Sequence, residues 1–170
     1  MTNVYLIGMM GSGKSVTGKR LAAKLGCHFV DLDEQVQIKV GKSVKEIFEN
    51  EGEAFFRDQE SVALKEASDI SPRVIATGGG TVLRLHNVEK MKATGKVIFL
   101  ETSPDVLWER VKIKKDRPLL FGDSPKEKLL SIYATRQPFY ERMFDFKVNT
   151  DGKTAQTVAD EIHRCLVKKV

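Results

Sequence analysis

Gly8-Met9-Met10-Gly11-Ser12-Gly13-Lys14-Ser15 is the stretch that decides the fold. It matches the pattern GxxxxGK[ST] of a phosphate-binding loop (P-loop), and it separates a short apolar run, 4–7, from a helix-forming segment, 14–25. Its glycines let backbone N–H groups turn toward phosphate oxygens, and the N-terminus of the following helix adds its positive dipole end. The sequence therefore predicts a nucleotide phosphate site directly after the first strand.

The last residues of this loop have the side chains that phosphoryl chemistry needs. Lys14 can reach the β- and γ-phosphates as a point charge, and the Ser15 hydroxyl can ligate Mg²⁺. We therefore expect Lys14 to face solvent or phosphate and not the core, with ATP as co-substrate and Mg²⁺ as cofactor.

Short apolar runs alternate with helical patterns along the rest of the chain. The candidate strands are 4–7, 29–32, 74–77, 96–100 and 145–148, and the candidate helices are 14–25, 44–49, 54–67, 85–93, 104–114, 126–143 and 154–167. Runs rich in Val, Ile, Leu and Phe are typical of strands buried on both faces. The alternation predicts an α/β fold with a mostly parallel sheet and ligands outside the carboxyl ends of the strands.

The composition, 41% hydrophobic and 30% charged, predicts one soluble globular domain covering residues 1–170. The net charge is +5, but the basic residues are scattered, so we do not expect nucleic acid as a partner. No apolar stretch approaches the ~20 residues of a membrane span, and no room is left for a signal peptide. The two cysteines form no CxxC motif and no cluster with histidines, which favours reduced thiols without structural zinc. We expect a cytoplasmic protein that is a monomer.

Two carboxylates close the second candidate strand, in Phe29-Val30-Asp31-Leu32-Asp33. An extended chain would place Asp31 and Asp33 on the same side. One carboxylate would then face the metal through water, and the other would be free to meet a hydroxyl. The alternative is that Asp33 is a helix N-cap, and the spacing alone leaves both interpretations open.

Anionic acceptors could be bound by groups further along the chain. Thr77-Gly78-Gly79-Gly80-Thr81 follows a buried strand candidate, and its glycines permit close backbone approach to a ligand, although a flexible turn is the alternative. Arg57 and Arg136 could form a fork for an anion, but a lone arginine is more often a solvated surface residue.

The segment 115–125, KDRPLLFGDSP, fits no regular element. It is too charged and too rich in proline for us to expect any of it in the core. A length of about eleven residues between two helices favours a mobile lid, which we predict over about 112–125. The alternative is an ordinary surface loop.

Together these motifs make the whole chain resemble the shikimate kinase family, small P-loop enzymes of the nucleoside monophosphate kinase structural class. The resemblance rests on Gly8-x4-Gly13-Lys14-Ser15, Asp31-x-Asp33, Gly52-Glu53-x2-Phe56-Arg57, Gly78-Gly79-Gly80, Asp116-Arg117-Pro118-Leu119-Leu120 and Arg136-x3-Tyr140. It implies a three-layer α/β/α sandwich with a five-stranded parallel sheet and a mobile lid.

The resemblance also implies an activity: ATP-dependent phosphorylation of the 3-hydroxyl of shikimate, giving shikimate 3-phosphate and ADP, in the biosynthesis of aromatic amino acids. The implied catalytic residues are Lys14, Asp33 and Arg117. The implied ATP-binding residues are Gly11, Ser12, Gly13, Lys14, Ser15, Val16, Arg110, Arg117 and Lys153. Shikimate would be bound by Asp33, Arg57, Gly78, Gly79, Gly80 and Arg136. The metal would be held by Ser15 and, through water, by Asp31.

The chain departs from the family pattern in one place and leaves rival functions open. The adenine-binding loop of the family usually has a proline before the last helix, and 148–155 has none. The closest rivals are another small-molecule kinase of this class, such as a gluconate or nucleotide kinase, and a nucleotide-binding regulatory module without turnover. Neither rival needs Arg57, the glycine triplet and Arg136 in this arrangement.

Overall fold

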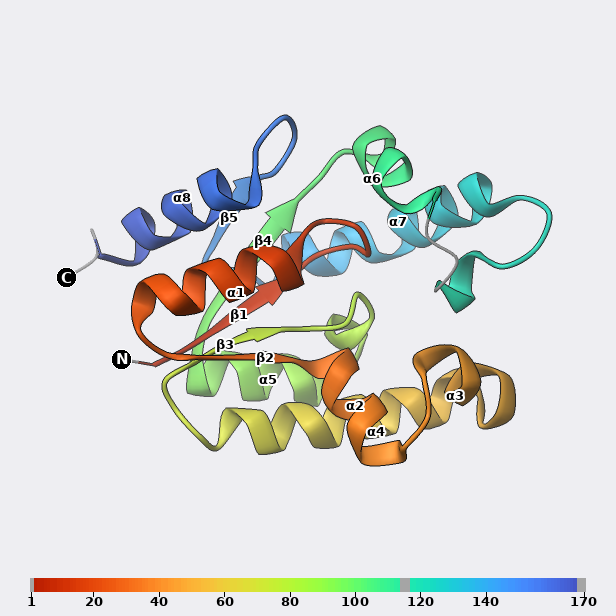
Figure 1. The fold of residues 1–170 in the computed structure, drawn as a ribbon, viewed down its shortest axis with the longest axis horizontal. Coiled ribbons are helices and arrows are strands. Elements are labelled where there is room, and N and C mark those ends of the chain that lie inside the picture. The colour runs from red at the N-terminus through yellow and green to blue at the C-terminus, as the bar shows by residue number, and fades with distance from the viewer. Residues whose placement is uncertain (1, 114–116, 168–170) are drawn as a thin grey trace.

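A five-stranded parallel sheet forms the centre of the computed structural model, which describes residues 2–113 and 117–167 (Figure 1). Its strands are β1 (Asn3–Ile7), β2 (His28–Asp31), β3 (Arg73–Ala76), β4 (Gly95–Glu101) and β5 (Phe146–Asn149), in the order β2-β3-β1-β4-β5. Each neighbouring pair is parallel. Because β1 is the central strand, the P-loop leaves the sheet at the middle of its carboxyl edge.

Helices cover both faces of the sheet. One face is covered by α1 (Lys14–Leu25) and α8 (Ala155–Val167), which lie side by side (Figure 1). The other face packs against α2 (Leu32–Val40), α3 (Val44–Asn50), α4 (Gly52–Ser68), α5 (Leu85–Thr94), α6 (Pro104–Val111) and α7 (Pro125–Glu141). Short 3₁₀ turns occur at η1 (Thr81–Leu83) and η2 (Pro118–Leu120).

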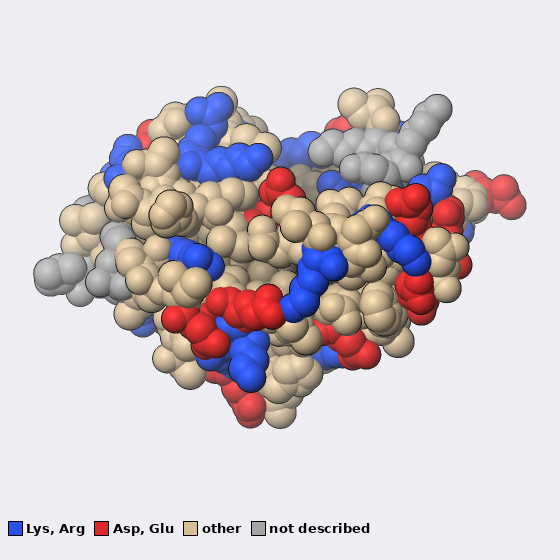
Figure 2. Space-filling model, turned by 60° about the horizontal axis from the view of Figure 1, so that its bottom comes forward, with Lys and Arg blue, Asp and Glu red and all other residues tan. Residues whose placement is uncertain are grey.

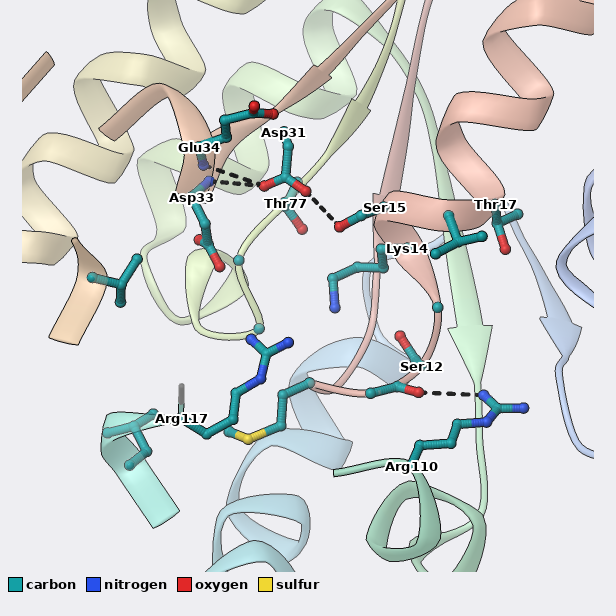
Figure 3. Close-up of a pocket in the computed structure, with 18 of the residues that line it drawn as sticks. Ser12, Lys14, Ser15, Thr17, Asp31, Asp33, Glu34, Thr77, Arg110 and Arg117 are labelled. Atoms are coloured by element: carbon teal, nitrogen blue, oxygen red, sulfur yellow. Dashed lines mark hydrogen bonds between the residues drawn. The ribbon is translucent and has the colours of Figure 1, made fainter. Parts of the chain in front are cut away.

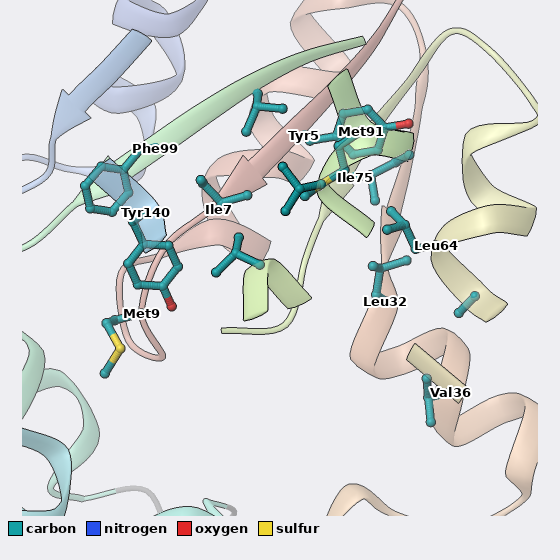
Figure 4. Packing of buried hydrophobic residues seen from close by; sticks show 14 of the residues in the cluster. Tyr5, Ile7, Met9, Leu32, Val36, Leu64, Ile75, Met91, Phe99 and Tyr140 are labelled. Carbon is teal, nitrogen blue, oxygen red and sulfur yellow. The ribbon is translucent and has the colours of Figure 1, made fainter. Parts of the chain in front are cut away.

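The core is divided by the sheet into two clusters, and β1 contributes to both. Val4 and Leu6 point into the cluster under α1 and α8, whereas Tyr5 and Ile7 point into the larger cluster on the opposite face (Figure 4). All five residues of β1 are buried, as a central strand with helices on both sides requires. The α/β fold with a parallel sheet predicted from the alternating pattern is confirmed, and so is the three-layer α/β/α sandwich that the family resemblance implied.

The region after β2 differs from the prediction. Leu32 does not end the strand but begins α2, a helix that the sequence pattern did not reveal. The N-cap is Asp31 rather than Asp33, because the Asp31 carboxylate accepts hydrogen bonds from the backbone N–H groups of Asp33 (3.1 Å) and Glu34 (3.5 Å). The prediction that Asp31 and Asp33 lie on one side of an extended chain is therefore wrong, since the helix begins between them.

The segment predicted as a lid is partly anchored, although positions 114–116 lie outside the described residues. Leu120 on η2 is only 7% exposed and belongs to the larger core cluster. The next residue, Phe121, lies under the ammonium of Lys45 from α3, 5.5 Å from nitrogen to ring centroid, and its carbonyl accepts a hydrogen bond from Lys128. The prediction that none of this segment enters the core is wrong at Leu120, whose apolar side chain packs beside α3 and α7.

The surface drawn in Figure 2 has interspersed acidic and basic side chains, with no band of one sign across the visible face. Within the described ranges, no helix is both long and apolar enough to cross a membrane. Cys27 and Cys165 are both free thiols and half-buried.

Candidate active site

A cavity of about 900 Å³ lies at the carboxyl edge of the sheet and contains most of the predicted site residues. Its wall includes the P-loop from Met10 to Val16, Asp31 at the end of β2, Asp33, Arg57, the first two glycines of the triplet, Arg110, Arg117, Arg136 and Lys153. Gly80 is not on this wall. A Cβ on Gly80 would lie 2.5 Å from Cζ of Arg57, so this glycine leaves room for the guanidinium.

The P-loop has the backbone conformation that its glycines predicted. Gly8, Gly11 and Gly13 have φ angles of 145°, 82° and 90°, which residues with a Cβ rarely adopt. The Nζ atom of Lys14 donates hydrogen bonds to the carbonyls of Gly8 (2.7 Å) and Met9 (2.8 Å). Burial lowers the pKa of Lys14 to about 8, against the opposing effect of Asp33. The ammonium is therefore held at the loop, beside the space for phosphate.

The side-chain oxygens of Ser15 and Asp31 lie together at the start of α1. The Ser15 hydroxyl donates to Oδ2 of Asp31 at 2.5 Å, while Oδ1 of Asp31 caps α2. In the described part of the chain, no group of three or more His, Cys, Asp or Glu residues could hold a metal by itself. This arrangement fits Mg²⁺, which prefers few protein oxygens and completes its shell with phosphates and water.

Asp33 projects from the first turn of α2 into the cavity, toward the same space as Lys14 and Arg117 (Figure 3). Its Oδ1 atom is buried and has no hydrogen-bond partner among the described residues. Burial, together with the nearby carboxylates of Glu60 and Asp31, raises the pKa of Asp33 to about 6, although the cations Lys14 and Arg57 oppose this rise. Asp33 is thus a carboxylate that is ionised at neutral pH but more basic than usual.

Glu60 is a site residue that the sequence analysis missed. It is fully buried on α4 and accepts hydrogen bonds from Nη1 of Arg57 (2.9 Å) and Oγ1 of Thr81 (2.5 Å). A Cβ on Gly78 would lie 2.0 Å from Oε1 of Glu60, so only glycine fits there. One sequence signal could have revealed Glu60: it follows Arg57 by three residues in the same predicted helix, so both side chains lie on the same helix face.

The two predicted acceptor arginines differ in their partners. Arg57 is paired with Glu60 and also with Glu53, at 3.2 Å. Arg136 is only 5% exposed, and no described carboxylate lies within 4.0 Å of its guanidinium. Burial lowers the pKa of Arg136, and the positive charge of Arg57 adds to this effect. A buried cation without a counterion is a strong binding site for an anionic ligand.

A loop after β5 borders the cavity through Thr150 and Lys153. Arg110 of α6 donates to the carbonyl of Gly11 (3.3 Å) and to the hydroxyl and carbonyl of Thr150 (both 3.1 Å). The backbone N–H of Ser103 donates to Asp151 at 3.1 Å. These bonds hold a loop that has no proline. Lys153 lines the cavity, but its ammonium pairs with Glu161 at 2.7 Å.

Comparisons with known proteins agree with this geometry. Residues 10–167 match the family model described as shikimate kinase. The chain is 39% identical to the shikimate kinase of Caldanaerobacter subterraneus subsp. tengcongensis, covering 99% of this chain and 98% of that protein. It is 42% identical to the shikimate kinase of Thermodesulfovibrio yellowstonii, covering 95% of this chain and 93% of that protein.

Solved structures give the same result. The shikimate kinase from Acinetobacter baumannii in complex with shikimate superposes with a TM-score of 0.96 at 35% identity, covering 99% of this chain and 94% of that chain. The shikimate kinase from Aquifex aeolicus superposes with a TM-score of 0.86 at 36% identity, covering 98% and 97% of the two chains. The chain therefore belongs to the shikimate kinase family.

Proposed function

We propose that this chain transfers the γ-phosphoryl group of ATP to the 3-hydroxyl of shikimate, giving shikimate 3-phosphate and ADP in the biosynthesis of aromatic amino acids. The observation that supports this most is a single cavity with a P-loop on one side and the buried Arg57 and Arg136 on the other. Shikimate has one carboxylate and several hydroxyls, so it can meet both arginines while presenting an alcohol to ATP.

Each group of the cavity then has a chemical role. Arg57 and Arg136 orient the acceptor through its carboxylate, which places the 3-hydroxyl beside Asp33. Asp33 accepts a hydrogen bond from that hydroxyl and can take its proton as the bond to phosphorus forms. Lys14 and Arg117 stabilise the negative charge on the transferring phosphoryl group and on the leaving ADP oxygen.

We further propose that Mg²⁺ is held by the Ser15 hydroxyl and, through water, by Asp31. When bound, this ion would neutralise charge on the β- and γ-phosphates. The Ser15–Asp31 hydrogen bond supports the proposal, because it brings the two oxygens together at the N-terminus of α1.

An ADP-release assay on the purified protein tests this function. It should compare shikimate, gluconate, several nucleoside monophosphates and no acceptor, each with Mg²⁺ and with excess EDTA. We expect rapid ADP release only with shikimate and Mg²⁺. Faster turnover with gluconate or a nucleotide would show that shikimate is not the acceptor. No turnover with any acceptor would favour a regulatory module.

Arg136→Lys should weaken shikimate binding strongly. A lysine keeps the charge but cannot form the two parallel hydrogen bonds of a guanidinium. Losing part of a desolvated charge pair costs roughly 2–5 kcal/mol, so the Kd for shikimate should rise at least tenfold. Calorimetric titration of each ligand separately measures this, and the Kd for ATP should stay nearly constant.

Arg142→Lys is the matched control, since Arg142 is exposed at the end of the same helix. Arg57→Lys should also weaken shikimate binding, but it additionally disturbs the buried Glu60, so Arg136 gives the cleaner measurement. Equal losses for shikimate and ATP would contradict the assignment of Arg136 to the acceptor carboxylate.

The pH dependence of kcat/KM should report the pKa values of the essential acid and base in the free enzyme. Because the pKa of Asp33 is raised to about 6, its reactive ionised form is lost as the pH falls through that value. Because the pKa of Lys14 is lowered to about 8, its charge is lost as the pH rises through that value. We therefore expect a bell-shaped profile with its maximum between these limits.

Asp33→Asn identifies the acidic limb. This variant should be much less active, and its pH profile should lack the acidic limb. Any effect of substrate titration would remain in the profiles of both proteins. An acidic limb that persists unchanged in Asp33→Asn would show that Asp33 is not the titrating group.

A further inference from the structure

Tyr140 is a fully buried tyrosine of α7 that has no part in the site chemistry described above. Its hydroxyl donates a hydrogen bond to the carbonyl of Gly79 at 2.5 Å. Its ring stacks on Phe99 of β4, with centroids 5.2 Å apart and an interplanar angle of 18° (Figure 4). Since β4 pairs directly with the central strand, the sheet fixes the position of the ring, and the ring fixes the position of the hydroxyl.

The same hydroxyl lies beside the guanidinium of Arg136. A Cβ on Gly79 would lie 3.0 Å from Nη1 of Arg136 and 3.5 Å from the hydroxyl oxygen of Tyr140. Burial raises the pKa of Tyr140, and a hydrogen bond and the charge of Arg136 oppose this rise. The phenol therefore stays neutral, donates a hydrogen bond to the carbonyl of Gly79, and can accept one from Arg136.

This neutral partner explains a difference between the two acceptor arginines. Arg57 is held by ion pairs with the carboxylates of Glu53 and Glu60. Arg136 has no such carboxylate among the described residues, so a phenol can orient its guanidinium without neutralising it. The full charge of Arg136 then remains available to an anion in the cavity.

We propose that Tyr140 is a positioning residue that holds the Gly79–Gly80 peptide and the Arg136 guanidinium in the geometry that binds the carboxylate of the acceptor. The peptide unit is planar, so fixing the Gly79 carbonyl also fixes the direction of the Gly80 N–H. The proposal rests on the proposed function only in taking shikimate as that acceptor. It adds a residue that sets carboxylate recognition without touching the substrate.

Tyr140→Phe tests the proposal because it removes one oxygen and keeps the stacked ring. The Gly79 carbonyl loses its buried donor, and the guanidinium loses a neighbour that orients it. We expect the KM for shikimate to rise about tenfold, with the KM for ATP changed less than about twofold. Tyr133→Phe is the matched control on the same helix, and we expect both KM values to stay unchanged there.

Shikimate methyl ester separates positioning from general damage, because it keeps the hydroxyls but has no carboxylate charge. The parent should turn over the ester poorly, and Tyr140→Phe should turn it over as well as the parent does. A double-mutant cycle with Arg136→Lys should show that the two substitutions are not additive. Equal losses for shikimate and its ester, or strict additivity, would overturn the proposal.

Backbone hydrogen exchange keeps this test independent of the proposed function. In the free protein, the amides of Thr81 and Leu83, which donate to the carbonyls of Gly78 and Gly80, should exchange faster in Tyr140→Phe than in the parent, while amides of β1 stay equally protected. If the parent fails to phosphorylate shikimate but this difference appears, the proposed function is wrong and the positioning role of Tyr140 stands. If the parent is active and the amides exchange equally in both proteins, Tyr140 does not position this peptide.

Discussion

Arg117→Ala is expected to lower kcat about 10³-fold while changing the KM values for ATP and shikimate only modestly. Arg117 lines the cavity and points toward the same space as Lys14 and Asp33 (Figure 3). A guanidinium in this position stabilises charge that develops as the phosphoryl group leaves ADP, and it helps to exclude water that could hydrolyse ATP. Its effect therefore falls mainly on the transition state, and steady-state kinetics with both substrates measures it.

Lys126→Ala is the control, because Lys126 lies close in sequence but is exposed on α7. We also expect limited proteolysis between Gly122 and Pro125 to slow when both ligands are bound. The single tryptophan, Trp108, lies with Leu120 and Phe121 around a neighbouring cavity, so its fluorescence should change under the same conditions. If Arg117→Ala kept its full kcat and proteolysis ignored the ligands, the lid would have no catalytic role.

Lys14→Ala should lower kcat by at least about 10²-fold and weaken ATP binding, because it removes the point charge at the β- and γ-phosphates. The fold should survive. The pKa of Lys14 in the folded chain is about 8, below its ordinary value of 10.5, so protonated Lys14 disfavours folding at neutral pH. Removing this ammonium is therefore not expected to lower the unfolding temperature, which calorimetry can measure beside the kinetics.

Lys65→Ala, at an exposed position on α4, is the matched control for loss of a lysine. Lys14→Met adds a second comparison, since it keeps most of the side-chain length without the charge. Turnover of ATP by Lys14→Ala at the parent rate would contradict the assignment of 8–15 as the phosphate site. A large loss of stability would instead show that the bonds from Lys14 to Gly8 and Met9 are needed to close the loop.

Local sequence patterns were sufficient for the backbone of the phosphate site. The glycines at 8, 11 and 13 have the positive φ angles that the motif requires, and α1 spans the predicted 14–25. Each buried strand was also found to within a few residues, because a run of apolar residues between turns has few alternatives. Such features depend on neighbours along the chain, so the sequence could determine them by itself.

Contacts between distant segments were decided only by the tertiary structure. Asp31 rather than Asp33 caps α2, and its second oxygen meets Ser15, 16 residues away. The hydroxyl of Tyr140 meets Gly79 across 61 residues, and the burial of Glu60 depends on Thr81 and Arg57 packing over it. A polar side chain is stable in the interior only when a partner arrives from elsewhere in the fold, and local propensity contains no information about that partner.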